Sequence, residues 1–347
     1  MVLTHFSSPT LALLIWHSAS VLLGQQPNGQ ALPTIVLNHQ DSYSISTAPF
    51  SFTSTQCDGR GDVFFDLLGR KIANGNILRA SADGQHLDQA RLPTDLGKHG
   101  EWHYSVTYEG ALYAIFSEAS DHRLIELSTS NEEVRRTTLQ LPRYFHVHSF
   151  AVLPEGNLMV AGSIPVGKTS VVAKEAPLLV WLAPDGRVLR QEVLGEPINP
   201  LFFRSESFIA TGRLHTFVAT TGSAISEFSP RGDLIQTFRL PKPSLDSWIV
   251  GLEFGDAHIA VEFAHPDTAA ASASASASGS DKPSGLYFGP VTQTWLMVNP
   301  VSGEAEGFYE MPPNFIGSAM CYLGGHDFLY LQVTNGKPTI VRATKFP

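Results

Sequence analysis

The feature of this sequence that most constrains its fold is a hairpin pattern that recurs along the chain. Six segments share a short apolar strand, a turn containing glycine and a second alternating strand; they begin at Phe50, His103, His148, Ser207, Trp248 and Gly317. Alternation of apolar and polar residues on either side of a glycine turn is typical of a β-hairpin. Because helical periodicity is weak throughout, the sequence predicts an all-β protein.

A second hairpin follows each of the first five. The turn residues of four of them, Gly84, Asn131, Gly186 and Gly232, are spaced about 50 positions apart, and a unit of roughly 40 to 50 residues with four short strands is the period of a β-propeller blade. Four of the second hairpins also end at a proline, which lacks an amide donor and is tolerated on an edge strand. We therefore predict a six-bladed β-propeller.

The sixth unit is one strand short. After Val333 only one more strand, Pro338–Lys345, is predicted before the sequence ends. The N-terminal run Thr34–Gln40 has strand character and no partner of its own. We predict that this run supplies the outer strand of the sixth blade, which closes the ring and makes residues 25–347 one domain.

One segment interrupts the repeat. Residues Asp267–Gly285 form a low-complexity tract of alanine and serine within the fifth unit. Such a tract cannot bury apolar surface, so we predict a disordered loop between two strands of the fifth blade.

The units resemble the repeats of NHL-type and related secreted bacterial β-propellers. The matching residues are Glu155–Val160 on an inner hairpin, and Pro184–Gly186 and Ala82–Gly84 on outer turns. The resemblance covers residues 34–347 and implies a scaffold, because these motifs consist of turn residues and alternation. Propellers serve as hydrolases, lyases and binding platforms, so the resemblance implies no particular activity.

The charge balance bears on the partner. The chain has 23 Lys and Arg against 32 Asp and Glu, for a net charge of −9. An acidic surface repels phosphate backbones and anionic lipid, which argues against nucleic acid as a partner. We expect a monomer that binds a protein or a glycan.

The N-terminus predicts export. Leu11–Gly24 is apolar, too short for an ordinary membrane span and of the right length for the core of a signal peptide. No Lys or Arg precedes Arg60, so the usual positive charge is missing; an uncleaved anchor or a wrong start codon is the alternative. We predict that residues 1–24 are a signal peptide and that the mature chain is secreted or periplasmic, with no membrane span.

The two cysteines, Cys57 and Cys321, fall in the first and sixth units, which closure makes neighbours. A disulfide is one interpretation in an oxidising compartment. The two cysteines are, however, offset by one residue relative to Asp62 and Asp327, and disulfide geometry is strict. Two separately buried thiols are therefore the preferred interpretation.

Two kinds of short motif match known binding sequences. Gly162–Thr169 fits the phosphate-binding loop pattern, but Pro177 and a β-rich run follow too soon for the required helix, so we interpret Lys168 as part of a chance match. The Arg-Gly-Asp tripeptides at Arg60 and Arg231 fall where the repeat requires turns, and we interpret them as turn residues.

Polar and aromatic residues gather where the inner strands begin. They are His103, His146, His148, Arg204, Glu206 and Asp246, together with Trp102 and Trp248. In a propeller the loops that enter the inner strands meet at one mouth of the central channel, so we predict a ligand site there. The alternative is that these residues are polar only because a channel mouth is wet.

Two functions remain open at this point. The favoured hypothesis is an exported, non-catalytic binding or interaction module that needs no cofactor. The alternative is a hydrolase or lyase assisted by a divalent cation, with His103, His148, Glu206 and Asp246 as ligands or acid–base groups.

Overall fold

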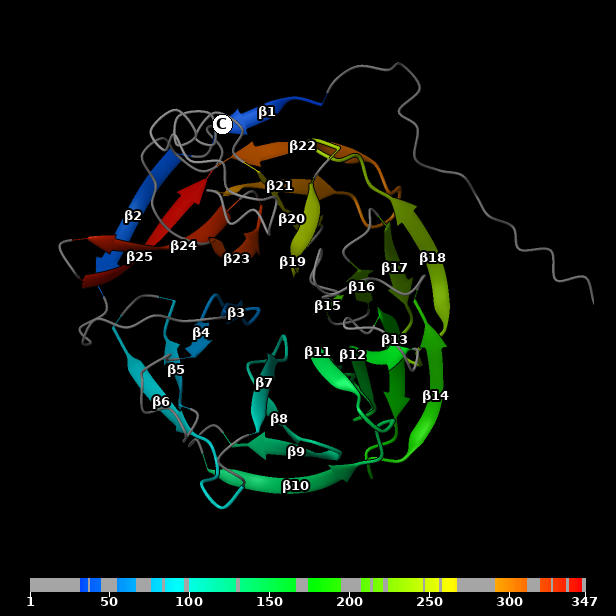
Figure 1. Cartoon of the computed structure of the whole chain (residues 1–347). Helices are drawn as coiled ribbons and strands as arrows, with labels where there is room; N and C mark the ends of the chain where they lie inside the picture. Colours follow the sequence, from blue (N-terminus) through cyan, green and yellow to red (C-terminus); the bar gives the residue numbers. More distant parts are fainter. Residues whose placement is uncertain are drawn as a thin grey trace, which may run out of the picture.

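The protein is a six-bladed β-propeller in the computed structural model (Figure 1). The structure describes residues 32–36, 38–44, 55–66, 76–82, 85–96, 100–128, 132–166, 174–194, 207–212, 215–220, 224–245, 247–255, 258–266, 291–310, 319–325, 327–334 and 337–344. Within these ranges all regular elements are strands, which form six sheets around a central axis. The predicted fold class is confirmed.

The first three blades follow one another along the chain. Blade 1 contains β3 (Thr55–Cys57), β4 (Val63–Asp66), β5 (Asn76–Ala80) and β6 (Leu87–Arg91). Blade 2 contains β7 (Glu101–Val106), β8 (Leu112–Glu118), β9 (Asp121–Leu127) and β10 (Glu133–Leu139). Blade 3 contains β11 (His146–Val152), β12 (Leu158–Val166), β13 (Lys174–Leu182) and β14 (Val188–Val193).

The other three blades include the N-terminal strands. Blade 4 contains β15 (Ser207–Thr211), β16 (Thr216–Thr220), β17 (Ala224–Phe228) and β18 (Leu234–Arg239). Blade 5 contains β19 (Trp248–Gly255), β20 (His258–Pro266), β21 (Val291–Val298), β22 (Ala305–Glu310) and β1 (Thr34–Val36). Blade 6 contains β23 (Ala319–Gly324), β24 (Asp327–Thr334), β25 (Lys337–Thr344) and β2 (Asn38–Ser44).

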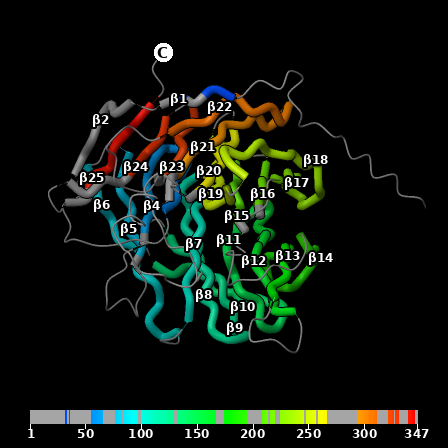
Figure 2. The backbone as a smooth tube through the Cα atoms, turned by 45° about the horizontal axis from the view of Figure 1, so that its top comes forward, coloured from blue at the N-terminus to red at the C-terminus, as the bar shows by residue number. Residues whose placement is uncertain are grey.

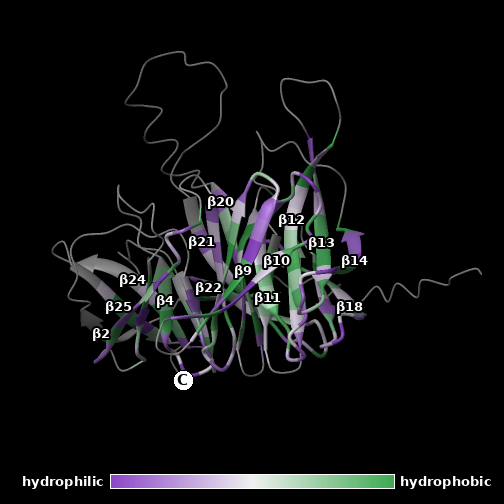
Figure 3. Ribbon diagram, turned by 90° about the horizontal axis from the view of Figure 1, so that it is seen from below, coloured by the Kyte–Doolittle hydropathy of each residue, from purple (hydrophilic) through white to green (hydrophobic). Residues whose placement is uncertain are grey.

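The hydrophobic core is divided among the contacts between blades. Strand alternation sends successive side chains to opposite faces of a sheet, so each blade packs on both neighbours. On β8, for example, Ile115 belongs to the cluster shared with blade 3, and Phe116 belongs to the cluster shared with blade 1. Seen from the side, β12 and β13 are apolar over most of their length, and the first two residues of β13, Lys174 and Glu175, are hydrophilic (Figure 3). The same period-2 pattern that predicted hairpins therefore builds one cluster at each junction of blades.

The N-terminal segment spans two blades. Thr34–Val36 pairs in parallel with β22 of blade 5, and Asn38–Ser44 pairs antiparallel with β25 as the outer strand of blade 6. Figure 1 shows β2 on the rim beside β25, and Figure 2 shows the blue part of β1 on the rim beside β22. The predicted single strand over Thr34–Gln40 is thus two strands in two sheets. The pairing with blade 5 was not predicted.

The inner strands, which line the channel, are tied to one another by side chains. Gln56 of blade 1 donates through Nε2 to the Tyr104 carbonyl (2.8 Å) and accepts from the Val106 amide (2.9 Å) on the free edge of β7. Ser149 of blade 3 accepts from the Ile209 amide of β15 (3.2 Å). These hydrogen bonds satisfy backbone groups on the channel edge of each sheet, where no further strand pairs with the inner strand. They also connect neighbouring blades.

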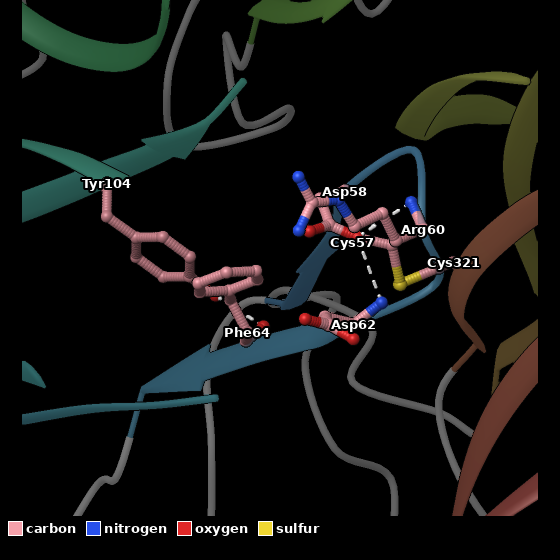
Figure 4. Close-up of a disulfide and its surroundings, with 7 residues drawn as sticks. All are labelled: Cys57, Asp58, Arg60, Asp62, Phe64, Tyr104 and Cys321. Atoms are coloured by element: carbon pink, nitrogen blue, oxygen red, sulfur yellow. Dashed lines mark hydrogen bonds between the residues drawn. A yellow bond between two sulfur atoms is a disulfide. The ribbon is translucent and has the colours of Figure 1, made fainter. Parts of the chain in front are cut away.

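A disulfide joins the first and last blades. Cys57 on β3 and Cys321 on β23 are bonded, with their Cα atoms 5.7 Å apart (Figure 4). The preferred prediction of two separate thiols is therefore wrong. The register offset that argued against the bond does not matter, because β23 bulges between Ala319 and Cys321 and again before Gly324.

The two motif interpretations can be compared with the structure. Residues 162–166 of the phosphate-loop match lie inside β12, paired along their length with β13, and Lys168 lies outside the described residues. In the first Arg-Gly-Asp tripeptide Asp62 is buried and accepts hydrogen bonds from Arg79 at 2.5 Å and from the Ala82 amide at 3.0 Å. The Asp62 carboxylate is therefore hydrogen-bonded within blade 1.

The structure does not describe the segments for which disorder and a signal peptide were predicted. The alanine and serine tract lies outside them, between β20 and β21. Residues 1–24, the predicted signal peptide, also lie outside them. Across the described part of the chain, no helix has the length and apolar character needed to cross a membrane.

Candidate functional site at blades 2 and 3

His103 sits on the inner strand of blade 2 and points toward blade 3. It lies opposite Ile115, a member of the cluster between these blades. Its ring makes a hydrogen bond with the backbone of His148, and its buried Nε2 has no partner among the described residues. The backbone contact fixes the ring and leaves Nε2 as an unsatisfied nitrogen.

His148 lies at a β-bulge of the neighbouring inner strand, between the paired residues Val147 and Ser149. Its Nε2 lies 3.2 Å from Ser163 Oγ, and that hydroxyl donates its proton to Glu175 Oε2 at 2.7 Å. Because a serine hydroxyl has one proton, Ser163 can only accept from His148, so Nε2 carries the imidazole proton. Nδ1 is then unprotonated, and this buried atom has no described partner.

Both rings are neutral at neutral pH. Burial lowers the pKa of His103 to about 4, and burial also lowers the pKa of His148 to about 4. Neighbouring histidines add to the effect, while Glu101 and Glu175 oppose it. The site therefore presents the lone pairs of neutral imidazoles, which accept hydrogen bonds.

A third histidine of this region, His122, was missed from the sequence. It is the second residue of β9, the third strand of blade 2, and is 1% exposed; its Nδ1 lies 3.0 Å from Ser117 Oγ. Burial lowers its pKa, and its Nε2 has no described partner. The prediction considered only the starts of inner strands and therefore left out His122. The signal available in the sequence was that a short turn between two strands places His122 opposite Ser117.

His146 begins β11 and is exposed. It interacts electrostatically with His122 and with His148, so four histidines are coupled at this end of blades 2 and 3. They lie on different faces: His103 and His122 lie on the face of blade 2 toward blade 3, whereas His148 contacts Ser163 on the far face of blade 3. In the described residues no group of three His, Cys, Asp or Glu is arranged to hold a metal ion.

The remaining predicted site residues divide into two groups. Trp102 packs on Phe116 with ring centroids 5.0 Å apart, against the cluster between blades 1 and 2, so it faces away from His103. Trp248 is half-buried at the start of β19, on blade 5. Arg204, Glu206 and Asp246 lie outside the described residues.

Similarity to known proteins does not identify the family of this chain. No protein-family model matches the sequence, and no curated protein matches it. The resemblance to NHL-type repeats therefore rests on its turn residues. Among solved structures, the chain is similar to a protein of unknown function from Bacteroides caccae, with 15% identity, a TM-score of 0.40, and coverage of 75% of this chain and 80% of that one.

Proposed function

We propose that this protein is an exported, non-catalytic binding module that recognises a polar ligand at the end of its channel formed by blades 2 and 3. The observation that carries the proposal is the set of buried imidazole nitrogens without a described partner, His103 Nε2 and His148 Nδ1. A buried acceptor left unpaired costs about 1–3 kcal/mol, so such atoms favour a partner that donates to them.

The chemistry of the site favours a ligand with hydroxyl or amide donors. The imidazoles are neutral acceptors, and the Glu175 carboxylate near His148 accepts as well. An anionic ligand would meet acceptors where it needs donors. A glycan, which carries many hydroxyl donors, fits these groups.

Export is supported by the disulfide. Bonds such as Cys57–Cys321 persist in oxidising compartments and are rare in the cytosol. Together with the N-terminal apolar run, this bond supports a secreted or periplasmic location. N-terminal sequencing of protein recovered from outside the cytoplasm tests it; a start at residue 25 is the expected result, and retention of the intact chain in the cytoplasm would contradict it.

The ligand proposal is tested by screening the purified protein on a glycan array and measuring Kd for each hit by calorimetry. His103→Phe and His148→Phe keep a planar ring and remove the acceptor. Each is expected to weaken binding about fivefold to tenfold, since a neutral hydrogen bond contributes about 1 kcal/mol.

The matched control is His86→Phe, because His86 is exposed on the outer turn of blade 1. It should bind as the wild type does, and thermal melts should show that all three variants fold. An array without hits, or hits that bind both site variants as tightly as the control, would rule out this site.

A further inference from the structure

Two glutamates point into the junction between blades 5 and 6. Glu253 on β19 lies opposite Ala260, and Glu262 on β20 lies opposite Trp295. Ala260 and Trp295 both belong to the core cluster between these two blades. Because residues paired across strands share a face, both carboxyl groups face blade 6.

The pair lies at the channel wall. β19 is the innermost strand of its sheet, so its free edge borders the central channel (Figure 1). Glu253 is partly exposed on this strand, whereas Glu262, one strand further out, is 8% exposed. Glu253 is therefore on the channel side of the pair, and Glu262 lies one strand further from the channel.

A glycine makes room for the inner carboxyl group. Gly251 follows the bulge of β19, as Ser149 follows the bulge of β11 in blade 3. In blade 3 the serine side chain extends to blade 4, but in blade 5 the equivalent space holds Glu262. A Cβ on Gly251 would lie 2.8 Å from Glu262 Oε2, so any other residue there would displace the carboxyl group.

No positive charge balances the pair. Among the described residues, neither carboxyl group has a Lys, Arg or His in an ion pair, and Glu262 Oε1 is buried without a hydrogen-bond partner. Burial raises the pKa of Glu253 to about 8, with repulsion from Glu262 as a second cause, and burial raises the pKa of Glu262 to about 8.

The histidine of this junction, His258 on the same face of β20, has partners of its own: its Nε2 lies 2.7 Å from Glu306 Oε1 and its Nδ1 lies 3.4 Å from the Tyr322 hydroxyl. Tyr330 of blade 6 lies close enough to Glu262 to interact electrostatically, which together with burial raises the pKa of Tyr330 well above its usual value. Trp295 is 2% exposed, and its Nε1 has no described partner. Trp295 and Tyr330 therefore bring no charge to the two carboxyl groups. Because both pKa values are raised to about 8, protons neutralise the pair at neutral pH, and a cation that binds there takes the place of these protons.

We propose that Glu253 and Glu262 bind a hard divalent cation, such as calcium, magnesium or manganese, at the channel wall of blade 5. The two side chains supply only oxygen donors, which hard cations prefer. Magnesium commonly keeps several of its waters and takes only one or two carboxylates from a protein. The site is on the opposite side of the ring from His103 and does not depend on the proposed ligand function.

Calorimetry on chelator-treated protein tests the proposal, with calcium, magnesium and manganese chlorides as ligands and zinc chloride for comparison. The variants are Glu253→Gln and Glu262→Gln, because glutamine has nearly the shape of a protonated glutamate and preserves packing. Glu155→Gln, at the exposed turn of blade 3, is the matched control.

At least one hard cation is expected to bind the wild type and the control equally, and each site variant at least tenfold more weakly. Two results would overturn the site: no heat with any of the three hard cations, or binding that both variants retain. Should Glu262→Gln fail to fold, the partly exposed Glu253 decides the outcome.

Discussion

Cys57 and Cys321 are 264 residues apart in the sequence, and a disulfide holds their Cα atoms 5.7 Å apart. The bond connects the inner strand of blade 1 to that of blade 6, at the junction where the ring closes. On the outer rim β2 pairs with β25, so the same blade is also completed by the N-terminal segment. The ring is thus closed by the Cys57–Cys321 disulfide on the channel side and by the outer strand β2 on the rim.

Removing the disulfide should lower stability markedly. In the chain-entropy treatment, a loop of this length contributes about 5.6 kcal/mol. We expect the Cys57→Ala, Cys321→Ala double variant, and the reduced wild type, to unfold at lower denaturant concentration than the oxidised protein. Equal midpoints, together with free thiols in a non-reducing peptide digest, would contradict the bond.

Shortening the N-terminus should have a graded effect. A chain beginning at residue 38 loses β1 at the edge of blade 5, together with Leu32, which packs on the core, and the Pro33 carbonyl, which accepts from the Phe308 amide. A chain beginning at residue 45 also loses β2, which leaves β25 with an open edge. The first is expected to melt slightly below the full chain, and the second to melt much lower and to aggregate. Similar melts for both chains would show that β2 does not hold blade 6.

Acidification should destabilise the protein through His103 and His148. Both have a pKa lowered to about 4 in the folded state, against 6.5 for ordinary histidine. The unfolded chain therefore takes up protons as pH falls from about 6.5 to 4, while the folded chain does not, so stability decreases in that window. Each group contributes up to about 3 kcal/mol, at about 1.4 kcal/mol per pKa unit.

Urea unfolding at intervals from pH 7.5 to 4.5 measures this effect. His103→Gln removes one titrating group, so its stability should fall less steeply with acidification than that of the wild type. His86→Gln, at an exposed position, should keep the wild-type slope. Parallel slopes for all three proteins would show that His103 does not titrate abnormally.

The two Arg-Gly-Asp tripeptides form a natural matched pair. Asp62 is 8% exposed and bonded to Arg79, whereas Asp233 is exposed. We expect Asp62→Ala to cost about 3 kcal/mol because it leaves the Arg79 guanidinium without its partner. Asp233→Ala should change stability by less than about 0.5 kcal/mol. Denaturant unfolding of the two variants measures the loss of stability in each. Equal losses would mean that the contact between Asp62 and Arg79 does not stabilise the protein.

Much of the fold could be predicted because its signals are local. Alternating apolar residues and a turn glycine, as in Glu155–Val160, predict a β-hairpin from a few neighbouring residues. The spacing of these hairpins along the sequence predicts the blades. The disulfide could not be predicted in the same way, since bulges in β23 shift Cys321 relative to any count along the chain. The second partner of the N-terminal segment, β22, was missed because a three-residue strand has almost no pattern.

The candidate site was predicted only in part. His103 and His148 were found because inner-strand starts meet at the channel, but Trp102 shows that the next residue along a strand faces the other way. His122, Ser163 and Glu175 come from second and third strands, whose approach to the channel end depends on twist and on bulges. Neither the tautomer of His148 nor the absence of a described partner at Nδ1 can be inferred without these neighbours.

The sequence by itself determined that this chain is all-β, that it repeats six times, and that its blades turn at glycines. Those properties follow from steric rules acting within a few residues. Only the tertiary structure decided which polar groups lose water and which find partners: the neutral histidines of blades 2 and 3, the unbalanced Glu253 and Glu262, and the Cys57–Cys321 bond. Burial and pairing depend on residues distant in the sequence, so they arise only when the ring has closed.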